Sequence, residues 1–141
     1  RKSSVFQNTM HFENDYQYGI KQEENIYPIL KEYFGSTLEK SKNKWSKFDF
    51  YDDSCTYEMK TRNNKKTTYP TTMITANKSV QVNNKKLVFI FNFTDELCYI
   101  RFDPDEFSHF EKRMFSRANM EDDEKEHYYI PIEKLSTLKI Y

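Results

Sequence analysis

The sequence predicts an α/β (α+β) fold, in which helices pack against a sheet. Three patterns indicate this class. Residues 15–34 carry apolar side chains at helical spacing, residues 47–62 alternate as a β-hairpin does, and residues 86–93 form an apolar run typical of a strand covered on both faces. Helical and strand patterns that follow one another in a single chain favour helices layered on one sheet.

Length and composition favour one intracellular domain. The chain has 141 residues, enough for one core, and we assign residues 1–14 to an N-terminal arm and residues 15–141 to the domain. With 12 Phe and 11 Tyr, that core is expected to consist largely of rings. No apolar run reaches the roughly 18 residues of a membrane span and no signal peptide is visible, so we expect a protein that is neither secreted nor membrane-bound.

The first helix is expected to begin at Asn14 or Asp15, which are good caps, and to end before Gly35. Pro28 lies within it and should bend or break it. On a helical wheel its apolar side chains form one stripe: Tyr16, Ile20, Tyr27, Leu30 and Phe34.

One carboxylate, Glu23, falls inside this apolar stripe, with Glu24 at the edge of the stripe. Burying a carboxylate without a partner or a metal is costly. One interpretation is that Glu23 points into a functional site. The other is that it lies at the boundary of the stripe, where it reaches water or pairs with Lys60.

The hairpin over residues 47–62 places acids and a lysine on defined faces, because strand residues point alternately to opposite sides. The second strand presents Cys55, Tyr57 and Met59 on an apolar face, and Thr56, Glu58, Lys60 and Arg62 on the other. The first strand presents Phe48 and Phe50 on one face, and Trp45, Asp49 and Tyr51 on the other. If Asp49 and Glu58 face the same way, the two carboxylates can hold a divalent cation such as Mg²⁺.

The remaining elements are less regular. They are expected in this order: a basic connection over 36–46 with Trp45 as a packing anchor, a basic turn over 63–66, a short helix over 72–79 capped by Thr71, a strand over 86–93, a turn at 95–96, a strand over 97–102, a helix from Asp103-Pro104 carrying Phe107, Phe110, Met114 and Phe115, an acidic loop over 120–126, a strand over 128–132 ending at Pro131 at a sheet edge, and a brief helix over 132–138.

Charge is unevenly distributed although the net charge is zero. Residues 40–86 hold 11 Lys or Arg against 4 Asp or Glu, whereas residues 103–141 hold 6 against 10. A basic middle segment suits a polyanion-binding face, for which the candidates are Arg62, Lys65, Lys66 and Lys78. The alternative is that these lysines only solvate a surface.

Cysteine and histidine offer little chemistry of their own. Cys55 and Cys98 fall in expected strands and are interpreted as reduced core residues, with a disulfide as the alternative. The three histidines, at positions 11, 109 and 127, lack ligand spacing and are expected to pack or face solvent.

A helix with Glu23, a strand with Asp49 and a strand with Glu58-x-Lys60 resemble the PD-(D/E)xK nuclease superfamily over roughly residues 15–102. The resemblance implies a restriction-endonuclease-like αβββαβ core, a central mixed sheet flanked by helices. Members include restriction endonucleases, junction resolvases and phage-type exonucleases. Two departures are visible: Phe48 replaces the proline before the motif aspartate, and the segment after Lys60 is not a clean amphipathic helix.

The resemblance also implies roles. Asp49 and Glu58, with the main-chain carbonyl of Met59, would hold Mg²⁺ or Mn²⁺, and Glu23 would place a second metal or orient its water. Lys60 would position the attacking water and stabilise the developing charge. Lys78 falls where some members keep a basic or amide residue; the alternative is an ordinary solvated lysine.

We therefore expect a metal-dependent endonuclease that hydrolyses phosphodiester bonds, with DNA favoured over RNA as the substrate. A homodimer would be in keeping with the family. The alternatives are a catalytically inactive nucleic-acid-binding domain on the same fold, and a protein-interaction domain whose contact surface is the acidic segment near residues 121–124.

Overall fold

The structure is a computed structural model of the whole chain, which describes residues 2–42, 46, 48–78, 84–115 and 125–141. For residues 2–16 and residue 78 it describes the backbone alone. The large sheet contains, in spatial order, β1 (Glu39–Lys40), β2 (Phe50–Tyr51), β3 (Cys55–Thr61), β5 (Lys86–Asn92), β6 (Glu96–Arg101) and β9 (Ser136–Ile140). The small sheet contains β4 (Thr71–Thr75), β8 (Lys125–Pro131) and β7 (Glu111–Phe115).

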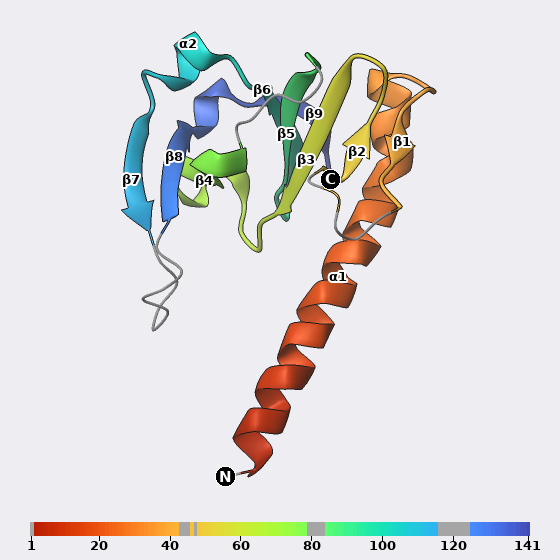
Figure 1. Cartoon of the computed structure of the whole chain (residues 1–141), viewed down its shortest axis with the longest axis vertical. Helices are drawn as coiled ribbons and strands as arrows, with labels where there is room; N and C mark the ends of the chain where they lie inside the picture. Colours follow the sequence, from red (N-terminus) through yellow and green to blue (C-terminus); the bar gives the residue numbers. More distant parts are fainter. Residues whose placement is uncertain (1, 43–45, 47, 79–83, 116–124) are drawn as a thin grey trace.

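The helix α1 (Lys2–Phe34) lies beside the β1–β3 end of the large sheet, and its N-terminal half projects beyond both sheets (Figure 1). It starts earlier than the cap signals at Asn14 and Asp15 predicted, so residues 2–13 are helical and the expected arm is wrong over this stretch. The sequence contains no Gly or Pro before Gly19 that would interrupt the helix there. The expected break at Pro28 is also wrong, because the helix continues through it.

The end of α1 is as predicted. Gly35 has a φ of 131°, a conformation that side chains with a Cβ rarely adopt. Its N–H donates to the carbonyl of Lys31 over 3.0 Å, which satisfies one of the last free carbonyls of the helix. The chain then turns and enters the sheet through β1, a strand that the sequence did not indicate.

The predicted hairpin is present, with β2 antiparallel to β3 and Phe50 opposite Tyr57. Its first strand is only two residues long, however, and Phe48 and Phe50 do not share a face as predicted. Phe50 packs on the α1 side of the sheet, whereas Phe48 packs on the other side. The reason is that Phe48 precedes the extended strand, so the alternation assumed for residues 48–51 does not reach it.

The centre of the large sheet is a parallel pair. β3 and β5 are parallel over seven residues, from Cys55 opposite Lys86 to Thr61 opposite Asn92. β5 and β6 then form the predicted hairpin, and β9 pairs with the outer edge of β6. Every residue of β5 after Lys86 is buried, as predicted for a strand covered on both faces.

The crossover from β3 to β5 differs from the prediction. In place of a helix over 72–79, it contains the 3₁₀ turn η1 (Lys66–Thr68), the strand β4 and the 3₁₀ turn η2 (Ala76–Lys78). Three threonines and Ile74 make β4 rich in β-branched residues, which favour a strand over a helix. β4 pairs with β8 along its whole length, and this long-range pairing decides the conformation.

The C-terminal third also corrects several expectations. Asp103 caps the helix at Pro104 as predicted, but that helix, α2 (Pro104–Phe107), has a single turn and gives way to β7. The predicted strand ending at Pro131 is the centre of the small sheet rather than an edge, because β4 and β7 pair with its two sides. The last segment forms a 3₁₀ turn, η4 (Ile132–Lys134), and then β9 instead of a helix.

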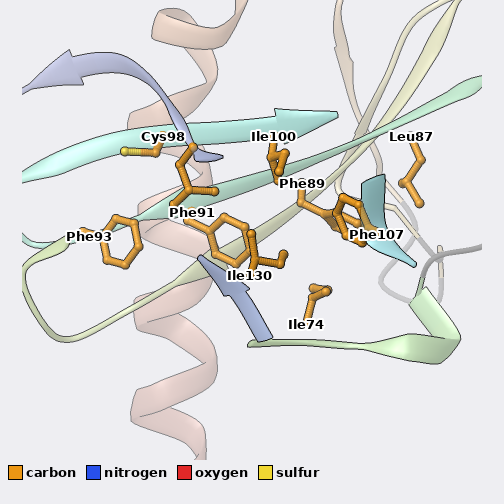
Figure 2. Close-up of a cluster of buried hydrophobic side chains, with 10 residues drawn as sticks. Ile74, Leu87, Phe89, Phe91, Phe93, Cys98, Ile100, Phe107 and Ile130 are labelled. Atoms are coloured by element: carbon orange, nitrogen blue, oxygen red, sulfur yellow. The ribbon is translucent and has the colours of Figure 1, made fainter. Parts of the chain in front are cut away.

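Two apolar clusters, one on each face of the large sheet, hold the layers together. Between α1 and the sheet lie Ile26, Leu30, Leu38, Phe50, Tyr57, Met59, Val88, Ile90 and Leu97. Between the two sheets lie Ile74, Leu87, Phe89, Phe91, Phe93, Cys98, Ile100, Phe107, Ile130 and Leu135, most of which Figure 2 shows. Phe89 and Phe107 have ring centroids 6.0 Å apart, so the predicted aromatic core is confirmed.

The chain is therefore a mixed α+β protein built on a mixed sheet, which confirms the fold class in its general form. One face of the sheet is covered by a helix and the other by a second sheet, where helices were expected on both. Across the residues that the structure describes, no helix combines the length and the apolar character needed to cross a membrane.

Phe107 should carry much of the contact between the sheets, because its buried ring packs on Phe89, Phe102, Phe110 and Tyr128. We expect Phe107→Ala to lower the free energy of unfolding by about 3–5 kcal/mol. Phe115→Ala, which truncates a ring that is 41% exposed, should cost less than about 1 kcal/mol. Urea unfolding monitored by circular dichroism measures both, and equal losses would show that Phe107 does not join the layers.

Candidate functional site

Asp49 is held at the outer edge of β3 by three hydrogen bonds. Its backbone N–H donates to the carbonyl of Tyr57 over 3.0 Å, and its carbonyl accepts from the N–H of Ser41 over 2.9 Å. Its carboxylate oxygen Oδ2 accepts from the N–H of Met59 over 2.8 Å. β2 pairs only with Thr56 and Tyr57 of β3. At Met59, the next outward N–H of β3, the Asp49 carboxylate accepts the hydrogen bond that a strand carbonyl would otherwise accept.

Glu58 and Lys60 occupy one face of β3, as the period of two predicted. The ammonium Nζ of Lys60 lies 3.3 Å from Oε1 of Glu58. Only 7% of the Glu58 side chain is exposed, against 31% for Lys60. A carboxylate this deeply buried needs compensation of its charge, and the neighbouring lysine supplies part of it.

Glu23 approaches Asp49 from α1, one turn before the buried Ile26. The pKa of Glu23 is raised to about 7, first because its carboxyl is half-buried. The Asp49 carboxylate raises it further, both by its charge and by a hydrogen bond with the protonated carboxyl of Glu23, and the charge of Glu58 contributes in the same direction. The three acids that the sequence singled out therefore influence one another across a short distance.

These acids meet around the edge of β3 rather than on one face of the sheet. Tyr57 and Met59 belong to the cluster that faces α1, so Glu58 between them points to the opposite face. Asp49 lies between the two sides, beside the backbone of Met59. Within the described part of the chain, no three side chains of the types His, Cys, Asp and Glu converge closely enough to enclose a metal ion by themselves.

A cleft of about 1120 Å³ opens on the α1 side of this edge. Its walls come from α1, β1, β2 and the segment between β1 and β2, and they include Glu23 and Asp49 but not Glu58 or Lys60. Lys40 is a cation of this cleft, and its Nζ lies 4.0 Å from Oε2 of Glu23 and 4.0 Å from Oε1 of Glu24. Its positive charge lowers the pKa of Glu23 and so opposes the effect of the other acids.

Lys40 is the site residue that the sequence did not indicate. The sequence places it in a basic connection, because β1 has only two residues and so shows no periodic pattern. The alternative considered for Glu23, a pair with Lys60, is wrong in its partner, since the lysine beside Glu23 is Lys40.

Two of the four predicted nucleic-acid contacts are engaged within the protein. Nη2 of Arg62 donates to the carbonyl of Met73 over 2.6 Å, and burial lowers the pKa of this guanidinium. Nζ of Lys66 lies 3.6 Å from Oε1 of Glu96. Lys65 is exposed, and the side chain of Lys78 lies outside the described residues, as do Trp45 and the acidic residues 121–124.

The remaining candidates have packing or surface roles. Cys55 and Cys98 are free thiols in β3 and β6, as predicted. Burial raises the pKa of Cys98 to about 11, which makes it a poor nucleophile near neutral pH. His109 and His127 each contact a backbone carbonyl, of Asp105 and Lys125, which suits the surface role expected for them.

Comparison with family models, with curated proteins and with solved structures finds no match to this chain.

The raised pKa of Glu23 predicts a specific dependence of stability on pH. Between about pH 4.5 and pH 7 the folded protein keeps a proton that the unfolded chain has lost, so stability falls as pH rises through this range and is constant above it. Glu23→Gln removes this loss. We expect the variant to be more stable than the parent by about 1–2 kcal/mol at pH 8, after allowance for solvent screening, and nearly equal to it at pH 4.

Urea unfolding of both proteins from pH 4 to pH 8 measures this difference. The matched control is Glu32→Gln, which removes an exposed carboxylate of α1 and should keep the fall in stability that the parent shows between about pH 4.5 and pH 7. If the free energies of unfolding of Glu23→Gln and the parent differ by the same amount at every pH, the pKa of Glu23 is not raised by the neighbouring acids.

Proposed function

We propose that the protein is a metal-dependent nuclease that hydrolyses phosphodiester bonds of nucleic acid, with DNA favoured, and that the edge of β3 is its active site. The observation that supports this most directly is the position of Asp49. Its carboxylate accepts the Met59 N–H, within reach of Glu23 on α1 and next to the residue pair Glu58 and Lys60.

The donors at this edge fit a hard divalent cation. Glu23, Asp49 and Glu58 supply carboxylate oxygens, which Mg²⁺ and Mn²⁺ prefer. The N–H and the C=O of one strand residue point toward the same neighbouring strand. The Met59 carbonyl therefore points to the same side as the Met59 N–H, which donates to Asp49. When Glu23 is ionised, the three acids carry one more charge than Lys40 and Lys60, and a bound cation would compensate this excess.

Each residue has a role in this proposal. Asp49 and Glu58, with the Met59 carbonyl, would hold Mg²⁺ or Mn²⁺, and Glu23 would hold a second ion or orient its water. The bound metal supplies charge neutralisation and an activated water. Lys60, whose Nζ lies 3.3 Å from Oε1 of Glu58, would position the attacking water and stabilise the negative charge that develops on the phosphate.

The order of elements supports the restriction-endonuclease-like interpretation in part. The helix with Glu23, the strand pair with Asp49 and Glu58-x-Lys60, and a crossover into a parallel strand follow in the expected sequence. The crossover carries β4 where a helix was expected, so the αβββαβ core remains a proposal for this chain.

A second candidate is a nucleic-acid-binding domain on the same fold that has lost catalysis. Two observations favour it: Glu58 points to the opposite face of the sheet from the cleft that holds Glu23 and Asp49, and no enclosed metal site is present among the described residues. This domain would bind nucleic acid in a salt-dependent manner and give no product with any divalent cation.

The nuclease proposal predicts cleavage that requires Mg²⁺ or Mn²⁺ and stops when EDTA removes the metal. We expect Asp49→Asn, Glu58→Gln and Lys60→Ala each to lower the cleavage rate at least about 100-fold, because each removes a ligand or a charge needed at the scissile phosphate. Gel analysis of labelled DNA and RNA, single-stranded and duplex, measures the rates.

The matched control is Asp53→Asn, which neutralises an exposed aspartate of the turn between β2 and β3 and should cleave like the parent. Circular dichroism spectra confirm that each variant is folded. If Glu58→Gln and Lys60→Ala cleave as fast as the parent, the edge of β3 is not the active site. If the parent binds nucleic acid but cleaves none, the second candidate is correct.

A further inference from the structure

The two lysines of the site, Lys40 and Lys60, lie on different sides of β3. Lys60 contacts Glu58 on the face directed away from α1, and neither residue lines the cleft. Lys40 lines the cleft together with Glu23 and Asp49. A nucleic-acid strand that enters this cleft therefore meets the ammonium of Lys40, whereas the motif lysine is on the other side of β3.

The backbone of Lys40 is fixed relative to Asp49. β1 is antiparallel to β2 with Lys40 opposite Phe50, the residue after Asp49. The next residue, Ser41, donates its N–H to the Asp49 carbonyl over 2.9 Å. The Lys40 side chain therefore extends into the cleft from a backbone position that is fixed next to Asp49.

The charged end of Lys40 is held only loosely. Its two carboxylate contacts are both 4.0 Å long, whereas a direct N–H⁺ to carboxylate hydrogen bond measures about 2.7–2.9 Å. The side chain is 25% exposed, so a ligand in the cleft can reach it. Such a cation can turn from Glu23 and Glu24 to a phosphate oxygen at little cost.

We infer that Lys40 is a substrate-positioning residue that binds a backbone phosphate of nucleic acid in the cleft between α1 and β1–β2. This inference rests on the proposed function in that it takes nucleic acid as the ligand, and it places the bound strand on the side of the site that holds Glu23 and Asp49. It adds a residue outside the Asp49 and Glu58-x-Lys60 pattern. Tyr51 also lines the cleft and is 38% exposed, and the Lys85 ammonium lies 5.7 Å from the centre of its ring.

Binding measured in EDTA tests the inference apart from catalysis. The probes are fluorescently labelled DNA and RNA oligonucleotides, single-stranded and duplex, titrated by anisotropy at several KCl concentrations. Lys40→Gln should weaken binding about tenfold at low salt and make the slope of log K against log salt shallower by about 0.7 to 0.9, the contribution of one phosphate.

Two further variants make the result specific. Lys40→Arg keeps the charge and should restore both affinity and slope. Lys139→Gln removes an exposed lysine of β9, away from the cleft, and should leave the slope unchanged. A Lys40 that only balances the charge of Glu23 would alter stability, which urea unfolding reports, but would not change the salt slope.

The outcomes separate this inference from the nuclease proposal. If the parent cleaves and Lys40→Gln keeps its salt slope, the inference is wrong and the nuclease proposal stands. If the parent does not cleave, but Lys40→Gln shows the shallower salt slope expected for one lost phosphate contact, the inference stands and the catalytic role is wrong. If no oligonucleotide binds to the parent in EDTA, the inference is wrong, and the cleavage assay with Mg²⁺ or Mn²⁺ decides the nuclease proposal separately.

Discussion

The parallel pairing of β3 with β5 is the constraint on which the other contacts depend. Parallel neighbours cannot be joined by a tight turn, so the chain that follows β3 crosses one face of the sheet before β5. That crossing supplies β4, and β4 pairs with β8, which in turn pairs with β7. Since α1 covers the opposite face, both sides of the two central strands are enclosed by apolar side chains.

The same arrangement leaves the outer edge of β3 to a strand of two residues. Where the pairing with β2 ends, the Asp49 carboxylate rather than a backbone carbonyl accepts the hydrogen bond from the Met59 N–H. This places Asp49 between the two faces of the sheet. The acids therefore gather where regular pairing stops, beside a rigid core. Their mutual repulsion is tolerated because Lys40 and Lys60 lie on either side of them.

Strand periodicity made part of this site predictable. Glu58 and Lys60 had to share a face because they are two residues apart, and the wheel placed Glu23 on the packed side of its helix. Lys40 and β4 were not predictable in this way. β1 is too short to show a pattern, and β4 owes its conformation to β8, a partner far along the chain, which outweighed the local cap signal at Thr71. Phe48 was misplaced because alternation was extended past the end of the strand.

Arg62 has a consequence for how the layers come apart. It follows the last residue of β3, and its guanidinium donates to the Met73 carbonyl on β4 and lies 5.9 Å from the centre of the Phe91 ring. Moving the small sheet away would break the hydrogen bond to Met73 and expose the buried Phe91 ring to water, so separating the sheets is costly before either one unfolds. The two sheets should accordingly open in a single cooperative transition, with no stable intermediate in which only one of them has melted.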